Sequence, residues 1–244
     1  MQASKTLLAR ALDAAARARD LTPKQIALWL DVACSNLEAG TSGGEENNLR
    51  PYLVRDGGCF VDVGANFGMH SKYVSDRDVE VFAFEPDPRA FEVLRRTAPR
   101  AHLYPCAVGD QTVEKTAFSL HRDTSSSRLR GKFSSQGTDY LSDCAVRMVR
   151  LDDVRLPTVG VLKIDTEGWE LPVLEGAVRL IKHDRPRVIA EIHSPREQNK
   201  ELVINFMRQL GYSRIRQIWK SSRNEYHLIF FELVSLQNPI EAAR

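Results

Sequence analysis

Short apolar segments alternate with helical segments along most of the chain, and this alternation constrains its fold more than any other feature. From residue 50 onward, apolar runs of strand length are separated by stretches with helical periodicity. Strands are predicted at 58–63, 79–84, 102–107, 159–164 and 187–192, and helices at 67–76, 88–97, 170–182 and 198–210. Alternation of this kind is typical of an α/β domain built on a parallel sheet.

Two later segments and one long polar segment complete the main domain. The apolar runs 213–219 and 226–232 are separated by a short polar stretch and predict an antiparallel hairpin at the edge of the sheet. Residues 119–143 are rich in Ser, Thr, Asp and Arg and show no clear periodicity. Such a length is unusual in a compact domain, so we expect a functional or mobile segment there. Within it, Arg122, Arg128 and Arg130 form a basic, hydroxyl-rich stretch with Ser125–Ser127, which is either a solvated loop or an acceptor-binding flap.

The first part of the chain follows a different pattern. Residues 4–19 carry Leu and Ala at helical spacing, and the Gly/Ser/Asn-rich stretch 39–48 indicates a loop. We therefore predict an N-terminal helical extension over 1–48 and a main domain over 49–244. Three roles are possible for the apolar face of this extension: it packs on the same chain, it forms a homodimer, or it covers the site.

Composition limits the classes of partner. The 244 residues carry a formal net charge of +2, which gives no reason to expect a nucleic acid or an anionic membrane as partner. No apolar run approaches the roughly 20 residues of a transmembrane helix. The 4 cysteines form no CxxC pair, and they are expected to be reduced thiols of a cytoplasmic protein.

A glycine-containing loop follows the first strand of the main domain, in the sequence FVDVGANFG at 60–68. In open α/β sheets, ligands bind beyond the carboxyl ends of the strands, and Gly64 and Gly68 allow the backbone to turn tightly there. A dinucleotide loop would read G-x-G-x-x-G, and the third glycine is missing. Asp62 would repel a pyrophosphate but suits a cofactor that carries an ammonium group. The loop thus favours S-adenosylmethionine, and an NAD-dependent oxidoreductase is the alternative.

A second acidic residue ends the next predicted strand, in the sequence FAFEPDP. Glu85 lies 23 residues after Asp62, a distance at which a carboxylate can accept hydrogen bonds from ribose hydroxyls. NAD enzymes use the same device, so Glu85 indicates a nucleoside without naming the cofactor.

Six segments occur in an order that resembles a known family. They are FVDVGANFG, FAFEPDP, CAVGD, VRLDDV, LKIDTEGWELPVLEGA and IAEIH. Together they resemble the FkbM family of methyltransferases over about residues 50–232, and the segment 163–176 is the most specific of them. The resemblance implies a seven-stranded, mostly parallel sheet of the class I methyltransferase (Rossmann-like) type. It also implies transfer of a methyl group from S-adenosylmethionine to a hydroxyl oxygen.

The same resemblance suggests acceptors and cofactor-binding residues. The implied acceptor is a sugar hydroxyl of a glycolipid, glycan or oligosaccharide, and the alternative is a polyketide or other secondary metabolite. A binding module without catalytic activity is a further alternative. The implied cofactor-binding residues are those of the loop, of the second strand end and of the CAVGD segment: Asp62, Val63, Gly64, Ala65, Asn66, Gly68, Glu85, Pro86, Cys106, Ala107 and Val108.

The catalytic candidates end two later strands. Methyl transfer to a hydroxyl needs the oxygen to be positioned and its proton to be removed, either by a base or with the help of a metal ion. Asp165 ends the segment VLKID, while Glu191 and His193 end VIAEIH. In one assignment, His193 or Asp165 takes the proton. In the other, Asp165, Glu191 and His193 hold a divalent ion such as Mg²⁺.

For two further residues near these candidates, the sequence predicts only a partner or a position. Lys163 points away from its neighbour Ile164 and is expected to pair with a nearby acid. His70 follows the glycine loop without an evident partner in the sequence; we expect it at the surface, and contact with the cofactor carboxylate is the alternative.

Overall fold

The computed structural model describes the backbone of residues 45–121, 127–129, 140–193, 197–220 and 226–233. Its contacts divide the chain into two compact units, Met1–Leu49 and Arg50–Arg244, and the second is described below. The helices predicted before residue 45 lie outside the described residues. Across the described part, none of the helices has the length and apolar character needed to cross a membrane.

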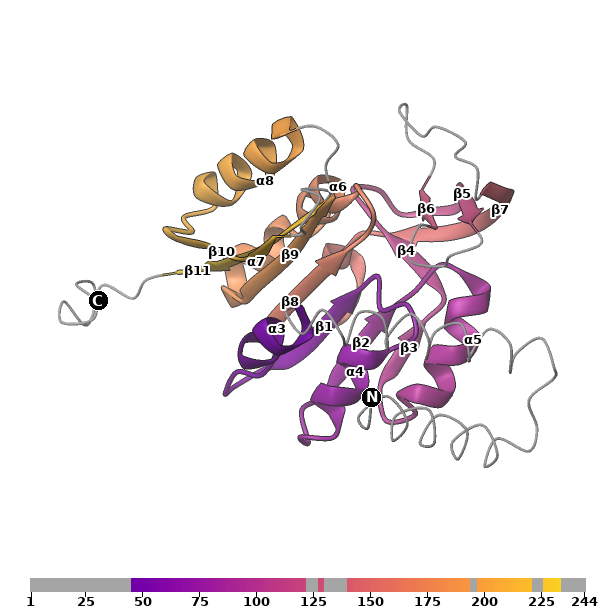
Figure 1. The fold of residues 1–244 in the computed structure, drawn as a ribbon, viewed down its shortest axis with the longest axis horizontal. Coiled ribbons are helices and arrows are strands. Elements are labelled where there is room, and N and C mark those ends of the chain that lie inside the picture. The colour runs from indigo at the N-terminus through magenta and orange to yellow at the C-terminus, as the bar shows by residue number, and fades with distance from the viewer. Residues whose placement is uncertain (1–44, 122–126, 130–139, 194–196, 221–225, 234–244) are drawn as a thin grey trace, which may run out of the picture. The chain divides into compact units, whose positions relative to one another are not determined.

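A seven-stranded sheet forms the centre of the second unit (Figure 1). Its strands are β1 (Cys59–Val63), β2 (Val81–Phe84), β3 (His102–Tyr104), β8 (Val159–Asp165), β9 (Arg187–His193), β10 (Arg214–Lys220) and β11 (Tyr226–Glu232). The order across the sheet is β10-β11-β9-β8-β1-β2-β3. All neighbours run parallel except β11, which is antiparallel to both β9 and β10. The predicted α/β sheet and its edge hairpin are therefore confirmed.

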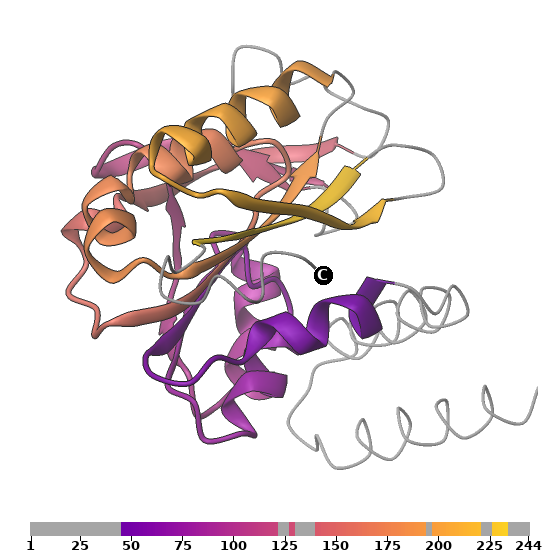
Figure 2. The ribbon, with the colours of Figure 1, turned by 90° about the vertical axis from the view of Figure 1, so that its left-hand side faces the viewer.

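Helices cover the two faces of this sheet. They are α4 (Met69–Ser75), α5 (Pro88–Thr97), α6 (Glu170–Glu175), α7 (Val178–Asp184) and α8 (Glu197–Gln209), with a 3-10 turn at Leu151–Asp153. Helix α3 (Glu45–Leu53) contains the boundary between the two units. Helices α4 and α8 lie on opposite sides of the sheet (Figure 2). Helix α5 begins as its sequence predicts, because Asp87 accepts a hydrogen bond from the Arg89 N–H and Pro88 occupies the first turn.

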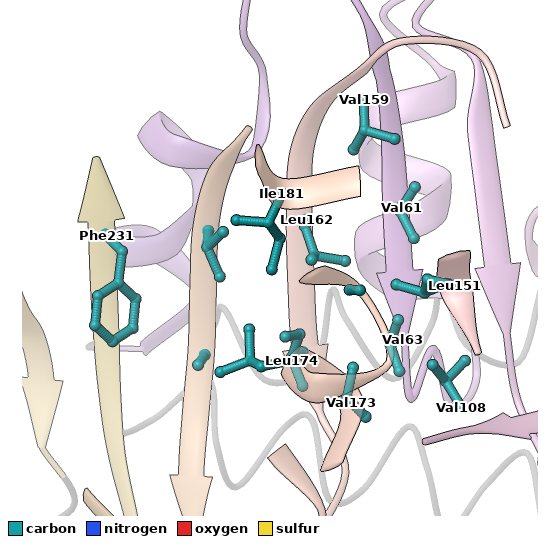
Figure 3. Packing of buried hydrophobic residues seen from close by; sticks show 14 of the residues in the cluster. Val61, Val63, Val108, Leu151, Val159, Leu162, Val173, Leu174, Ile181 and Phe231 are labelled. Carbon is teal, nitrogen blue, oxygen red and sulfur yellow. The ribbon is translucent and has the colours of Figure 1, made fainter. Parts of the chain in front are cut away.

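The apolar core lies on the side of α6, α7 and α8 (Figure 3). Val61 and Val63 of β1 and Leu162 of β8 are buried there together with Leu174 and Ile181 of the helices. Side chains alternate along a strand, so the residues between these valines and leucines point to the other face. The core on one face thereby directs the polar residues of β1 and β8 onto the face that α4 covers.

A second, smaller sheet was missed by the sequence pattern. It consists of β4 (Cys106–Val108), β5 (Val113–His121), β6 (Arg128–Leu129) and β7 (Tyr140–Val149), in the order β4-β7-β5-β6. Residues 119–121 and 140–143, at the two ends of the segment without clear periodicity, are therefore paired strand residues. The residues 122–126 and 130–139 lie outside the described part.

Two predicted elements are divided in the structure. The single strand predicted at 102–107 is two strands in two sheets, because Pro105 between them has no N–H for a strand ladder. The single helix predicted at 170–182 is divided into α6 and α7 at Gly176. A Cβ on Gly176 would lie 1.9 Å from the Gly109 carbonyl oxygen, so the glycine permits this close approach to the turn after β4.

Candidate functional site

The loop after β1 lies directly against the end of β8. Gly64 and Gly68 have φ angles of 74° and 80°, in the region that favours glycine. A Cβ on Gly64 would lie 1.7 Å from the carbonyl oxygen of Asp165, and one on Gly68 would lie 2.4 Å from Leu94 Cδ1. Gly64 is therefore required by a contact with the backbone, whereas Gly68 is favoured by its positive φ angle, because the end of the Leu94 side chain can shift. Gly64 also brings the loop next to a predicted catalytic residue.

Asp62 lies beneath this loop and is completely buried. Ser71 Oγ, in the first turn of α4, donates a hydrogen bond of 2.7 Å to Asp62 Oδ2. The other carboxylate oxygen, Oδ1, lies 3.2 Å from Lys163 Nζ. A buried carboxylate is expensive without partners, and here a hydroxyl and an ammonium supply them.

Lys163 is the centre of the charged cluster, and its side chain is only 3% exposed. Its Nζ lies 3.4 Å from Asp165 Oδ2 and donates a hydrogen bond to it. Burial by itself would lower the pKa of Lys163, but the carboxylates of Asp62, Asp165 and Glu191 outweigh it and raise that pKa. The predicted pairing of Lys163 with an acid is confirmed, and the lysine is held as an ammonium.

The predicted catalytic residues Asp165 and Glu191 are brought together by the pairing of β8 with β9. Their Cα atoms are partners in the parallel register, so the two side chains leave the sheet on the same face. The Asp165 side chain is 27% exposed, which makes it the member of the Lys163 ion pairs that reaches solvent. His193 is the last residue of β9 and pairs with Tyr226 through the backbone, and its side chain lies outside the described part. Among the residues with described positions, no group of three His, Cys, Asp or Glu side chains is arranged to hold a metal ion.

Glu85, at the end of β2, is held by backbone groups on both of its oxygens. Asn66 N–H donates a 2.7 Å hydrogen bond to Oε2, and Asp87 N–H donates one of 2.7 Å to Oε1. Burial raises the pKa of Glu85 to about 8, although these two N–H donors act in the opposite direction. The carboxyl group is thus rigidly placed beside the glycine loop, and its charge is sensitive to what binds there.

An arginine connects the Glu85 segment to the smaller sheet. Arg89 Nη2 lies 2.6 Å from Oδ2 of the buried Asp87. The same nitrogen donates to the His121 carbonyl at 2.7 Å and to Ser127 Oγ at 3.2 Å. A continuous series of hydrogen bonds therefore runs from Glu85 through Asp87 and Arg89 to β5.

The remaining predicted cofactor residues are mostly apolar and buried. Val63, Cys106 and Val108 belong to the larger core cluster, whereas Ala107 belongs to the cluster of the smaller sheet. Burial raises the pKa of the Cys106 thiol to about 11, so it remains a thiol at neutral pH. Ala65 is buried and Pro86 is half-buried beside Glu85.

Two residues in the site were not predicted. His70 Nε2 is buried and has no hydrogen-bond partner in the described part of the chain. Burial of this nitrogen, with the charge of Lys163, lowers the pKa of His70 to about 4, so the imidazole is neutral. The residue as a whole is half-buried, so the expected surface position holds only for part of it. Glu170 is completely buried and accepts a 2.8 Å hydrogen bond from Gly168 N–H, which closes the turn after Asp165. In the sequence, the only signal for His70 was its place two residues after Gly68.

The comparisons with known proteins agree on one family. The model of the FkbM methyltransferase domain matches residues 62–214, which is more than half of the chain. The 31-O-demethyl-FK506 methyltransferase of Streptomyces tacrolimicus is 30% identical over 57% of this chain and 67% of its own length. The hexuronic acid methyltransferase of Haloferax volcanii is 29% identical over 62% of this chain and 63% of its own length.

A solved structure agrees with the fold. The FkbM methyltransferase of Methylobacillus flagellatus superposes with a TM-score of 0.56 at 18% identity, covering 94% of this chain. The chain spans only 58% of that protein and about two thirds of the two relatives. The strand order with one antiparallel strand is that of the class I methyltransferases, as predicted. With the family model extending from Asp62 to the start of β10, the chain belongs to the FkbM family of methyltransferases.

Proposed function

We propose that the protein transfers a methyl group from S-adenosylmethionine to a hydroxyl oxygen. The observation that carries this proposal is the placement of Glu85, whose two oxygens each accept a backbone N–H beside the glycine loop. A carboxylate has about four lone-pair sites, so Glu85 retains capacity to accept from the two hydroxyls of a ribose. The residues present therefore fit the nucleoside half of the cofactor.

The charge of the cluster around Lys163 supports binding of the methionine half of the cofactor. Lys163 faces the carboxylates of Asp62, Asp165 and Glu191, so negative charge is in excess at this edge of the sheet. S-adenosylmethionine carries an ammonium and a sulfonium, and both are stabilised by an acidic surrounding. When bound, it supplies a methyl group that is ready for transfer to a nucleophile.

We assign the general base to Asp165. Its carboxylate is the partly exposed end of the cluster, and it adjoins Glu191 on the next strand. A general base must lie within hydrogen-bond reach of the hydroxyl proton, which requires such an accessible position. His193 remains the second candidate, as predicted from the sequence.

We propose a sugar hydroxyl as the acceptor. One relative of this chain is named as a hexuronic acid methyltransferase, which supports a carbohydrate. The other is named as a methyltransferase of an O-demethyl compound, which supports a secondary metabolite as the second candidate. Both names are consistent with transfer to a small molecule or a glycan.

The proposal is tested in two steps with the full chain. Isothermal titration should give binding of S-adenosylmethionine and none of NAD. Incubation with S-adenosylmethionine and a panel of hexuronic acids, nucleotide sugars and glycolipids should release S-adenosylhomocysteine with at least one acceptor. Binding of NAD alone would overturn the assignment of the cofactor, and cofactor binding without turnover on any acceptor would favour a non-catalytic binding module.

The base is tested separately. Asp165→Asn should lower turnover by about 10²- to 10⁴-fold, a much larger effect than its effect on cofactor affinity, to which Asp62 and Glu191 still contribute. Asp76→Asn is the matched control, because Asp76 is an exposed partner of Lys72 on α4. Full activity of Asp165→Asn would transfer the role to His193, and His193→Ala would then be expected to lose turnover.

A further inference from the structure

The buried ammonium of Lys163 lies where oxygen ligands converge. Asp62 Oδ1 and Asp165 Oδ2 approach its Nζ to 3.2 and 3.4 Å. Glu191 adds a third negative charge to the surroundings of the same nitrogen. Oxygen atoms of several carboxylates around one position are also what Mg²⁺ and Ca²⁺ require.

The register of the sheet explains why the lysine holds this position. Lys163 is the Cα partner of Asp62 on one side and of Ile189 on the other, at the centre of three parallel strands. A lysine whose ammonium group is buried at this position loses its hydration. The free-energy cost of that loss is large unless nearby anions compensate for it. The carboxylates of β1 and β8 provide that compensation, so ammonium and carboxylates require one another.

The distances suit an ammonium better than a metal ion. Mg²⁺ binds carboxylate oxygens at about 2.0–2.1 Å, which is about 1 Å shorter than the contacts that Lys163 makes. A divalent ion and a lysine nitrogen cannot occupy the same space, and each would repel the other.

We propose that the Lys163 ammonium is the resident cation of this site, so that it takes the place of a divalent metal ion and positions Asp165. The exclusion of metal ions depends only on the cluster. Its catalytic consequence, which is methyl transfer without a divalent ion, rests on the proposed function. Lys163 is thus a positioning residue that acts through Asp165.

Titration of the full chain with MnCl₂ tests the exclusion without cofactor or acceptor. Wild type is expected not to bind Mn²⁺ at this site at millimolar concentration. Lys163→Gln removes the counter-charge from the carboxylates, and its Mn²⁺ affinity should be at least tenfold higher than that of wild type. The added Asp165→Asn substitution should abolish the gain. Lys163→Arg, which keeps the charge, should not gain affinity.

Lys115→Gln is the matched control, since Lys115 is an exposed residue of β5. Circular dichroism and thermal melting report whether each variant folds. If Lys163→Gln does not fold, the test uses wild type and Lys163→Arg. The proposal is overturned if either of these proteins binds Mn²⁺ and the Asp165→Asn substitution removes that binding. A folded Lys163→Gln that gains no Mn²⁺ affinity also overturns it.

Measurement of turnover with and without EDTA is a second test. Wild-type turnover with and without EDTA should be equal, and loss of turnover that MgCl₂ restores would overturn the proposal. A protein that excludes Mn²⁺ as expected but transfers no methyl group would refute the proposed function and leave the lysine assignment supported. The two failures are therefore distinguishable.

Discussion

The carboxyl edge of the larger sheet buries an ion pair, whereas the smaller sheet buries mainly apolar side chains and has an ion pair exposed to solvent. Asp62 and Lys163 are almost completely buried and paired with each other. In the smaller sheet most of the buried side chains are apolar, such as Phe118 and Met148, and the polar Ser119 and His121 of β5 are buried beside them. Its cross-strand pair Arg147–Glu114 is 53% and 83% exposed.

This difference predicts where substitutions are tolerated. Buried ions need particular partners at particular distances. We therefore expect the carboxyl edge of the larger sheet to be destabilised when any one of its charged groups is displaced. Exposed ion pairs contribute little, and apolar packing accepts changes that conserve volume. The series of hydrogen bonds through Arg89 is one connection between the two regions, and substitutions there measure how far the stability of one region depends on the other.

The largest effect is expected for Gly64→Ala. Its Cβ would lie 1.7 Å from the Asp165 carbonyl oxygen, and the φ angle of 74° is strained for alanine. We expect the free energy of unfolding to fall by more than about 3 kcal/mol, since β1 must separate from β8. Unfolding in urea measures this change.

Gly57→Ala is the control that separates the two effects of Gly64→Ala, which are the steric clash of the Cβ atom and the strain of a positive φ angle. Gly57 has a φ angle of 76°, and a Cβ there would have no atom within 4 Å. Its substitution should therefore cost only about 1–2 kcal/mol. Equal losses for the two variants would mean that the approach of the loop to Asp165 does not limit the stability of this edge.

The larger sheet could be predicted because its strands are continuous apolar runs. The strand predicted at 187–192 is observed as β9, and the helix predicted at 88–97 is observed as α5. Local composition and periodicity determine such buried elements. The candidates Asp62, Asp165 and Glu191 could also be predicted, because they lie on strands of this sheet, and Glu85 could be predicted because it directly follows β2.

The smaller sheet could not be predicted in the same way. Strand β5 mixes apolar and polar residues, and its exposed positions alternate only in part with buried ones. It pairs with β7 across the segment 122–139, and the sequence does not record such a distant partner. The burial of His70 depends likewise on packing of α4 against a charged cluster that three strands assemble.

The next largest effect concerns cofactor binding through Glu85. Under the proposed function, ribose hydroxyls donate to the ionised carboxylate, so Glu85→Gln should weaken S-adenosylmethionine binding by about 10- to 100-fold. Glu92→Gln is the matched control, because Glu92 is partly exposed on α5 and pairs with arginines of its own helix. Equal affinity in Glu85→Gln and wild type would contradict the ribose assignment.

The pH dependence of this binding follows from the raised pKa. Glu85 has a pKa of about 8, so it is mostly protonated at pH 7 before binding. Donors to the carboxylate favour its ionised form and lower the pKa, so binding should release a proton. Affinity should therefore increase as the pH rises from 7 to 9. Titration in two buffers of different ionisation enthalpy measures the proton, and Glu85→Gln should release none.

A smaller effect is expected where the two regions join. Arg89→Met removes the side-chain partner of Asp87 and the donor to β5, although Asp87 still accepts the backbone N–H of residue 89. Because Arg89 is partly exposed, we expect a loss of about 1–2 kcal/mol. Hydrogen exchange should accelerate in β5 and remain unchanged in β8. Arg96→Met, which removes an exposed helix pair, is the control.

The smallest effect is expected at the exposed pair of the smaller sheet. Arg147 Nε lies 3.5 Å from Glu114 Oε1 with both side chains largely in solvent, so Arg147→Gln should change the free energy of unfolding by no more than about 0.5 kcal/mol. Val146→Ala, one residue earlier on β7, removes buried atoms and should cost more. If the arginine variant lost more stability than the valine variant, ion pairing would hold the smaller sheet together. The contrast between a charged edge and an apolar sheet would then be wrong.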